Sequence, residues 1–137
     1  MRVPSDHGAV GHSDADVLLH AVVDAMLGAL KAGDIGRRYP DSDPTLLGAD
    51  STRFARETAA LARADGWEPV NVDATVLLER PKLAPHVPEI EQRVAESLGI
   101  GIERVSVKAA SNEGLDAIGE GRAIACNAVV LMARGHR

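Results

Sequence analysis

Aromatic residues are nearly absent from this chain of 137 residues, which has one phenylalanine, one tyrosine and one tryptophan. Apolar residues nevertheless make up 45% of the chain, enough for a hydrophobic core. With so few rings available, we expect that core to be aliphatic and rich in alanine, with closely packed elements. The length suits a single domain built around one core.

Several other features are missing, and each absence excludes a class of protein. Cys126 is the single cysteine, which rules out an intrachain disulfide framework and favours the reducing cytoplasm. No apolar run reaches the roughly 18 residues of a membrane span, and no signal peptide is recognisable. The formal net charge of −5 argues against duplex nucleic acid as the main partner.

The hydrophobic periodicity predicts three helices and three strands. The helices are expected over residues 13–32, 51–66 and 85–98, and the strands over 70–78, 104–110 and 122–133. Residues 33–50, dense in glycine, proline and aspartate, are expected to form a loop. A strand–helix–strand order with a right-handed crossover makes the first two strands parallel neighbours.

These elements predict an α+β fold, in which helices pack on one face of a small mixed β-sheet. The other face of the sheet then needs cover. We expect it to carry small residues, namely Ala74, Ala109, Ala125 and Ala128. An oligomer would supply that cover, and a further strand is the alternative.

The first predicted helix carries an unusual polar stripe. Placed at 100° per residue, its apolar side chains form a broad arc, made of Val17, Leu18, Ala21, Val22, Ala25, Met26 and Ala29. Asp16, His20 and Asp24 stack in one narrow sector outside that arc. A histidine beside a carboxylate suits a metal site, because one ring nitrogen binds the ion while the other is oriented by an acceptor. A solvated stripe is the alternative, since one histidine is weak evidence for metal.

Two later segments carry candidate ligand-binding groups. Asp34, Asp41 and Asp43 lie among glycines and prolines, a composition that suits sugar hydroxyls or hydrated cations but also an ordinary acidic loop. Lys82 and the stretch 108–113 supply ammonium, hydroxyl, amide and carboxylate groups that could hold a phosphate and Mg²⁺. For the stretch 108–113, the alternative is that these are the ordinary polar residues of a turn after a strand.

Taken in order, these motifs resemble the 2-C-methyl-D-erythritol 2,4-cyclodiphosphate synthase family of non-mevalonate isoprenoid synthesis, over residues 2–134. The motifs are GHSDADVLLHAVVDAMLGAL, GDIGRRYPDSDP, GADS, NVDATVLLERPKLAPH and VKAASNEGLDAIGEG. The resemblance implies one domain over 1–137, a homotrimer with active sites between adjacent subunits, and no membrane or nucleic-acid partner. The implied reaction cyclises 4-diphosphocytidyl-2-C-methyl-D-erythritol 2-phosphate and releases CMP.

The resemblance also implies roles for individual residues. His12 and Ser111 would stabilise the transition state, His20 would bind Zn²⁺, and Glu113 would bind Mg²⁺ or Mn²⁺. The residues implied to bind substrate are His12, Ser13, Asp34, Ile35, Gly36, Tyr39, Pro40, Asp41, Ser42, Asp43, Leu78, Pro81, Lys82, Leu83, Ala84, Ala110, Ser111, Asn112 and Glu113.

The sequence departs from the family at its beginning. The family opens with a strand and an Asp-x-His that supplies two of three zinc ligands, and that segment is missing here. We therefore expect a narrow sheet and weak zinc binding through His20 alone. Two alternatives stay open: a non-catalytic trimer that binds nucleotide or isoprenoid phosphates, and a metal-dependent phosphohydrolase in which water replaces the internal nucleophile.

Overall fold

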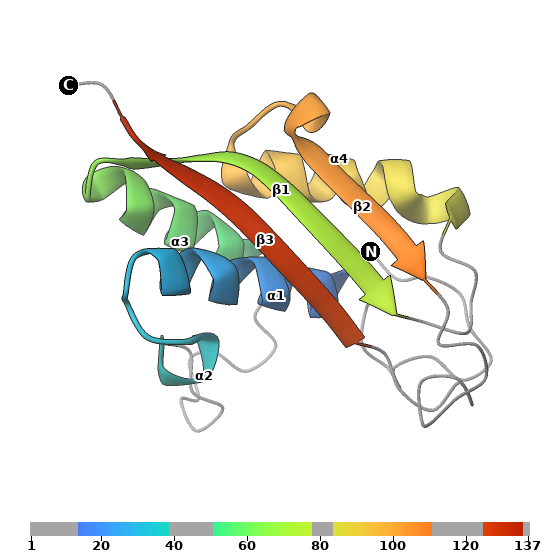
Figure 1. Cartoon of the computed structure of the whole chain (residues 1–137), viewed down its shortest axis with the longest axis horizontal. Helices are drawn as coiled ribbons and strands as arrows, with labels where there is room; N and C mark the ends of the chain where they lie inside the picture. Colours follow the sequence, from blue (N-terminus) through green and yellow to red (C-terminus); the bar gives the residue numbers. More distant parts are fainter. Residues whose placement is uncertain (1–13, 39–50, 78–83, 111–124, 136–137) are drawn as a thin grey trace.

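The computed structural model describes residues 14–38, 51–77, 84–110 and 125–135. Figure 1 shows these parts as one sheet with helices behind it. The elements are α1 (Asp14–Ala29), α2 (Ile35–Arg38), α3 (Ser51–Ala64), β1 (Trp67–Leu77), η2 (Ala84–His86), α4 (Val87–Leu98), η3 (Ile102–Arg104), β2 (Val105–Ala110) and β3 (Ala125–Arg134).

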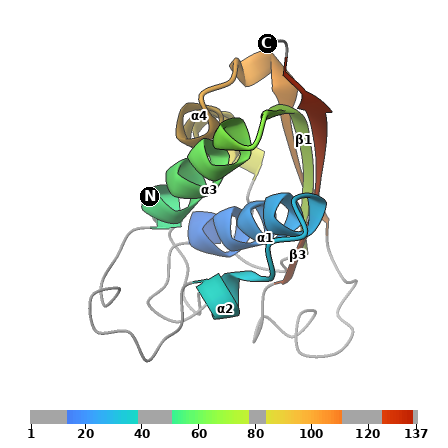
Figure 2. The same ribbon diagram turned by 90° about the vertical axis from the view of Figure 1, so that its left-hand side faces the viewer.

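The described strands form one mixed sheet in the order β2-β1-β3. β1 runs parallel to β2 and antiparallel to β3, with Leu77 paired to Ala110 on one side and to Ala125 on the other. Figure 2 shows α1, α3 and α4 together on one side of this sheet. The predicted α+β fold, with helices on one face of a small mixed sheet, is therefore confirmed.

Alternation along β1 determines which side chains enter the core. Val72, Ala74 and Val76 are buried, whereas Asn71 and Asp73 are exposed on the opposite face. The prediction that Ala74 and Ala128 lie on the open face is wrong, since Ala74 is fully buried and Ala128 packs against the same core. Small side chains at these paired positions leave room for helices to approach the sheet closely.

The buried face of α1 also differs from the predicted arc. Its fully buried side chains are Leu18, Leu19, Val22, Val23, Met26 and Leu27. Ala29, predicted to lie in the arc, is exposed. The larger side chains of α1 pack into the core. The buried face is therefore rotated about the helix axis relative to the predicted arc, and the small alanines lie at its margin.

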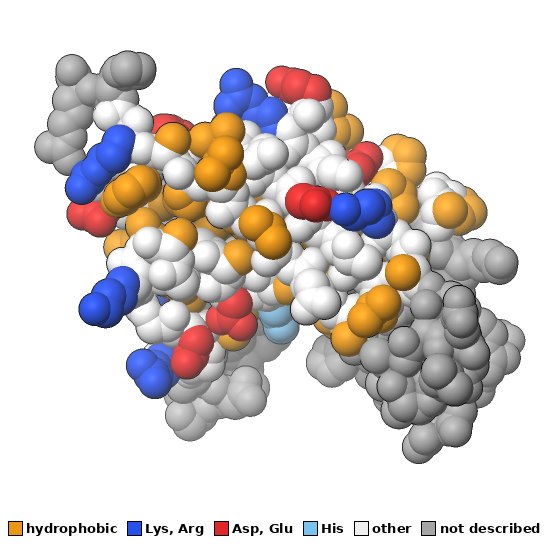
Figure 3. Space-filling model, in the orientation of Figure 1, with side chains coloured by type: hydrophobic (Ala, Val, Ile, Leu, Met, Phe, Trp, Pro, Cys, Tyr) orange, Lys and Arg blue, Asp and Glu red, His pale blue; other side chains and the backbone are white. Residues whose placement is uncertain are grey.

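The open face of the sheet is partly apolar and partly charged. Val129 and Leu131 on β3 are 69% and 55% exposed. Beside them, Lys108 Nζ on β2 lies 2.6 Å from Asp73 Oδ1 on β1. Figure 3, which views this face, shows hydrophobic side chains along the line of β3 next to an acidic and a basic side chain.

The helix boundaries differ from the prediction around residue 30. α1 ends at Ala29 rather than 32, because Lys31 and Gly33 adopt left-handed φ values of 54° and 96°. A four-residue helix, α2, follows within the stretch predicted to be a loop. Gly99, as predicted, ends α4 in the left-handed conformation.

The rotated face of α1 leads to a prediction about stability. Leu19 is fully buried, so Leu19→Ala should lower the free energy of unfolding by about 2–5 kcal/mol through lost contacts and a residual cavity. Ile102→Ala, at a position that is 42% exposed, is the matched control and should cost well under half as much. Chemical denaturation of both variants checks this, and equal losses would contradict the packing of α1.

Candidate functional site

The exposed face of α1 carries two side chains that bond to other segments. His20 Nε2 lies 2.8 Å from the hydroxyl oxygen of Ser51, the first residue of α3. Ser51 is 4% exposed, so its hydroxyl is held in place by the surrounding packing. When Nε2 donates to that oxygen, the lone pair of the imidazole lies on Nδ1, where it is available to a metal ion or a hydrogen-bond donor.

One turn further along α1, Asp24 bonds to the turn that follows the helix. The backbone N–H of Ile35 donates to Asp24 Oδ1 over 2.6 Å. The two residues are 11 positions apart, and the acceptor is a carboxylate, so this is a charge-assisted bond between separate elements. The predicted stripe is therefore not merely solvated: two of its side chains fix neighbouring segments.

Asp34 stands at the start of α2 and caps it. Its Oδ1 accepts a hydrogen bond from the Arg37 backbone N–H over 2.8 Å, and its Oδ2 lies 3.4 Å from Arg37 Nε. The carboxylate still has 54% of its side-chain surface exposed. It can thus cap the helix and present an anionic acceptor to a ligand at the same time.

Gly36 follows in the same turn, and neither its backbone nor packing among the described residues requires glycine there. A Cβ placed on it would meet Asp34 Oδ1 at 3.5 Å, which is ordinary van der Waals contact. The absence of a side chain leaves the backbone beside the Asp34 carboxylate open to a close approach by a ligand.

The parallel pairing of β1 and β2 places the carboxyl ends of these two strands side by side. Leu77 and Ala110, the last residues of the strands, are register partners. In the sequence, one predicted ligand segment follows Leu77 and the other begins at Ala110. Carboxyl ends of neighbouring parallel strands are a common place for ligand sites in α/β proteins.

The described residues contain only part of the predicted site. They include His20, Asp34, Ile35, Gly36, Ala84 and Ala110, of which Ala84 is exposed and Ala110 half-buried. The structure joins Ile35 to α1 and places Ala110 beside Leu77. The other predicted residues, which lie outside the described ranges, are His12, Ser13, Tyr39, Pro40, Asp41, Ser42, Asp43, Leu78, Pro81, Lys82, Leu83, Ser111, Asn112 and Glu113.

A zinc site needs more donors than the described ranges supply. Within them, no group of three or more His, Cys, Asp or Glu side chains could hold a metal ion. His20 offers one oriented imidazole, while the Asp24 carboxylate already accepts the Ile35 amide. Together these residues fit one position of a zinc site and do not complete it.

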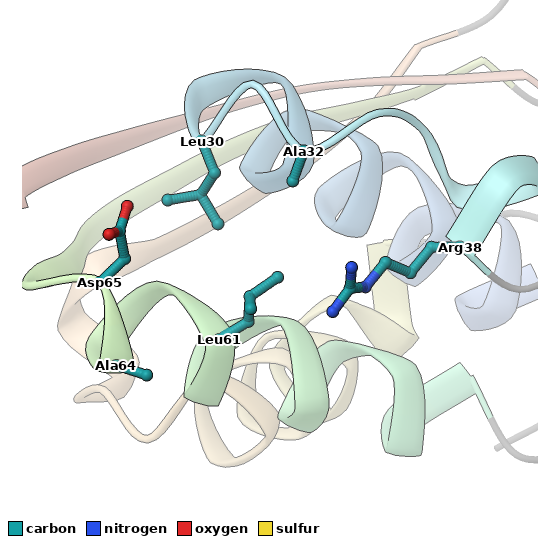
Figure 4. Close-up of a pocket in the computed structure, with 6 residues that line it drawn as sticks. All are labelled: Leu30, Ala32, Arg38, Leu61, Ala64 and Asp65. Atoms are coloured by element: carbon teal, nitrogen blue, oxygen red, sulfur yellow. The ribbon is translucent and has the colours of Figure 1, made fainter.

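Two hollows lie apart from these groups. One, of about 350 Å³, is lined by Leu30, Ala32, Arg38, Leu61, Ala64 and Asp65. Figure 4 shows Arg38 reaching from α2 toward Leu61 on α3, while Leu30, just after the end of α1, points toward α3. The other, of about 290 Å³, lies at the sheet edge around Asp73, Glu103 and Lys108. Neither includes His20 or Asp34 among the lining residues that the structure describes.

The sequence did not reveal the bonds that hold this region. The sequence places Ser51 only at the start of a predicted helix and Asp24 only in the polar stripe. Asp34 directly precedes α2, and its side chain accepts the backbone N–H of Arg37, three residues further on. Aspartate is a common N-cap residue, so Asp34 could have indicated the start of this helix. No local pattern could have indicated that Asp24 reaches Ile35.

Comparison with known proteins gives a consistent result. The model of the YgbB family matches residues 1–133. A 2-C-methyl-D-erythritol 2,4-cyclodiphosphate synthase of Bordetella avium is 52% identical over 98% of this chain and 83% of its own length. The synthase of the same name from Geobacter metallireducens is 53% identical over 96% and 84%.

A solved structure agrees with these relatives. It is described as 2C-methyl-D-erythritol-2,4-cyclodiphosphate synthase in a CDP-bound form. It superposes with a TM-score of 0.85 at 35% identity, covering 96% of this chain and 85% of that one. Fold and sequence therefore point to the same group of enzymes.

The thiol of Cys126 is expected to be unreactive in the folded protein, and this leads to a prediction. Burial raises the pKa of its thiol to about 11, so very little thiolate is present near neutral pH. Ellman's reagent at pH 8 should therefore react roughly 100-fold more slowly with the folded protein than with the protein in guanidinium, since each pKa unit is tenfold in thiolate. Equal rates in the two states would contradict this assignment.

Proposed function

The chain belongs to the YgbB family, and on that premise we propose that it cyclises 4-diphosphocytidyl-2-C-methyl-D-erythritol 2-phosphate as a single domain. The observation that carries the proposal is about 50% identity, over nearly the whole chain, to synthases of one name. The products are 2-C-methyl-D-erythritol 2,4-cyclodiphosphate and CMP, which makes the enzyme a phosphorus–oxygen lyase. The free Cys126 suits the cytoplasm as its compartment.

The reaction transfers a phosphoryl group within one molecule. An oxygen of the 2-phosphate forms a bond to the β-phosphorus, the bond from that phosphorus to the bridging oxygen breaks, and CMP leaves with that oxygen. Both groups are anionic, so the protein must hold them in line and neutralise charge. Neither water nor a redox partner is consumed.

The turn at the start of α2 is the proposed binding site for the erythritol part. The exposed Asp34 carboxylate can accept hydrogen bonds from hydroxyl groups, and the backbone of Ile35 and Gly36 lies beside it. Tyr39, Pro40, Asp41, Ser42 and Asp43 follow directly in the chain, and we propose that they line the same pocket.

The neighbouring ends of β1 and β2 support a site for the cytidine diphosphate part. Leu78, Pro81, Lys82, Leu83 and Ala84 follow β1, and Ala110, Ser111, Asn112 and Glu113 begin at the end of β2. We propose that the first group surrounds the nucleotide and the second contacts its α-phosphate. His12, with Ser13 beside it, and Ser111 are the proposed transition-state stabilisers.

Divalent cations are the proposed cofactors. The ion neutralises phosphate charge when it is bound. His20 would hold Zn²⁺ through the nitrogen that Ser51 leaves open, and Glu113 would hold Mg²⁺ or Mn²⁺. The described residues fit one zinc position only.

A homotrimer is the proposed assembly, with active sites between adjacent subunits. Val129 and Leu131 lie exposed on the open face of the sheet, where an apolar stripe indicates a partner surface. A second and a third copy of the chain are the proposed partners, because the helices already cover the other face.

The proposed activity is tested by a metal-replete assay with the cytidine substrate. We expect release of CMP and, by phosphorus NMR, a cyclic diphosphate as the second product. An open-chain product would instead support a phosphohydrolase. No turnover, with CDP still bound in calorimetry, would support the non-catalytic nucleotide-binding relative.

The proposed role of Asp34 gives a prediction. Asp34→Asn keeps an oxygen that can cap α2 but removes the charge that strengthens bonds to the erythritol hydroxyls. We expect KM to rise about tenfold, in line with the loss of one charge-assisted hydrogen bond. Steady-state kinetics measures this, with Glu89→Gln on α4 as the charge-matched control. A KM equal to that of the control would remove Asp34 from the site.

The proposed assembly gives another prediction. Leu131→Asp places a charge in the open face and should convert the trimer to monomers, because burying an unpaired carboxylate costs several kcal/mol. Light scattering coupled to size-exclusion chromatography measures the mass. Ile102→Asp, at another exposed apolar position, should leave the trimer intact. A wild-type monomer, or a trimeric Leu131→Asp protein, would exclude this interface.

A further inference from the structure

The turn that presents Asp34 has little to hold it in place by itself. α2 contains only four residues, too few for an isolated helix to be stable in water. The Asp34 cap is a bond within the turn and cannot orient the turn relative to the rest of the protein. Its placement depends on bonds to a larger element.

Asp24 supplies such a bond from a rigid support. α1 is anchored by six fully buried side chains, so its exposed face has a defined orientation. From that face Asp24 Oδ1 accepts the Ile35 N–H over 2.6 Å. The side chain of Ile35 packs against the core cluster. Ile35 is therefore held through its backbone N–H by Asp24 and through its side chain by the core.

Asp24 and His20 bond to different segments. The bond from Asp24 uses Oδ1 and holds the Ile35 N–H in the turn. His20 is one helical turn away and is held by Ser51 instead. The two members of the stripe therefore support two different segments, α3 through His20 and the start of α2 through Asp24.

We propose that Asp24 is a positioning residue, which holds the Asp34-Ile35-Gly36 turn in the orientation that binds the erythritol hydroxyls. This inference rests on the proposed function. Without the Asp24 carboxylate, the turn would sample other orientations, and substrate binding would be weakened because the bound orientation is populated only part of the time. The chemical step, which occurs at the phosphates, would change little.

The test compares Asp24→Ala, Asp24→Asn and Glu57→Ala, the last of which removes an exposed carboxylate from α3. In Asp24→Ala we expect KM to rise about tenfold, kcat to stay within about threefold, and exchange of the Ile35 amide with deuterium to speed up at least tenfold. Asp24→Asn retains an acceptor oxygen and should restore both values to within about threefold of the wild type. Glu57→Ala should match the wild type throughout.

Zinc content separates this role from metal ligation. It should be unchanged in Asp24→Ala and lowered in His20→Ala. Loss of zinc in Asp24→Ala, or an unchanged KM together with unchanged Ile35 exchange, would overturn the inference.

The proposed function can fail separately from the positioning role. If the wild-type chain does not turn over the cytidine substrate, the proposed function fails and the erythritol part of this inference falls with it. The exchange rate of the Ile35 amide would still show whether Asp24 holds the turn. An active wild type beside an Asp24→Ala variant with normal kinetics would refute the positioning role alone.

Discussion

The rotation of α1 about its own axis is the constraint on which the rest of the structure depends. Six large apolar side chains on one face are fully buried against the sheet and the other helices. On the exposed face, His20 and Asp24 bond to Ser51 and Ile35, at the starts of α3 and α2. Because one residue corresponds to 100° of rotation, a shift by a single position would expose core leucines and break both bonds.

Much of the architecture could be predicted from the sequence because it follows from local patterns. Alternation of apolar residues located the strands, and the strand–helix–strand order required β1 and β2 to be parallel. The glycine at 99 marked the end of α4 correctly, since the left-handed conformation it adopts is unfavourable for other residues. These features depend on neighbours in the chain.

The remaining features could not be predicted because they depend on contacts between distant residues or on small differences in burial. The Asp24–Ile35 bond spans 11 positions and the His20–Ser51 bond spans 31. α2 has only four residues, too few for hydrophobic periodicity to indicate a helix. On β3 both faces carry apolar side chains, so hydrophobicity does not show which face holds Ala128. On β1, by contrast, the alternation of Val72 with Asp73 is enough to place Ala74 in the core.

The candidate site was predicted mostly by resemblance, and the structure adds physical reasons only for some of its members. For His20 and Asp34 it shows what holds each side chain and what remains available to a ligand. For Ala110 it shows a place beside Leu77 at the ends of neighbouring strands, and for Ala84 an exposed position at the start of η2. Neither alanine offers side-chain chemistry for a ligand. The resemblance can thus indicate that Asp34 binds substrate. That Asp24 holds the turn carrying Asp34 can be inferred only from the bond between Asp24 and Ile35.

The open face of the sheet combines an apolar stripe with a charge pair that suits burial. Asp73 pairs in register with Val129 across β1 and β3, and its carboxylate lies 2.6 Å from Lys108 Nζ on the other side. Both charged side chains are about half exposed in one protomer, where such a pair contributes little to stability. A lone charge beside Val129 would oppose burial by another copy, whereas a charge that is already paired lowers that cost. The pairing of Asp73 with Lys108 thus lowers the cost of covering the apolar stripe, and in this respect the face is compatible with the proposed trimer.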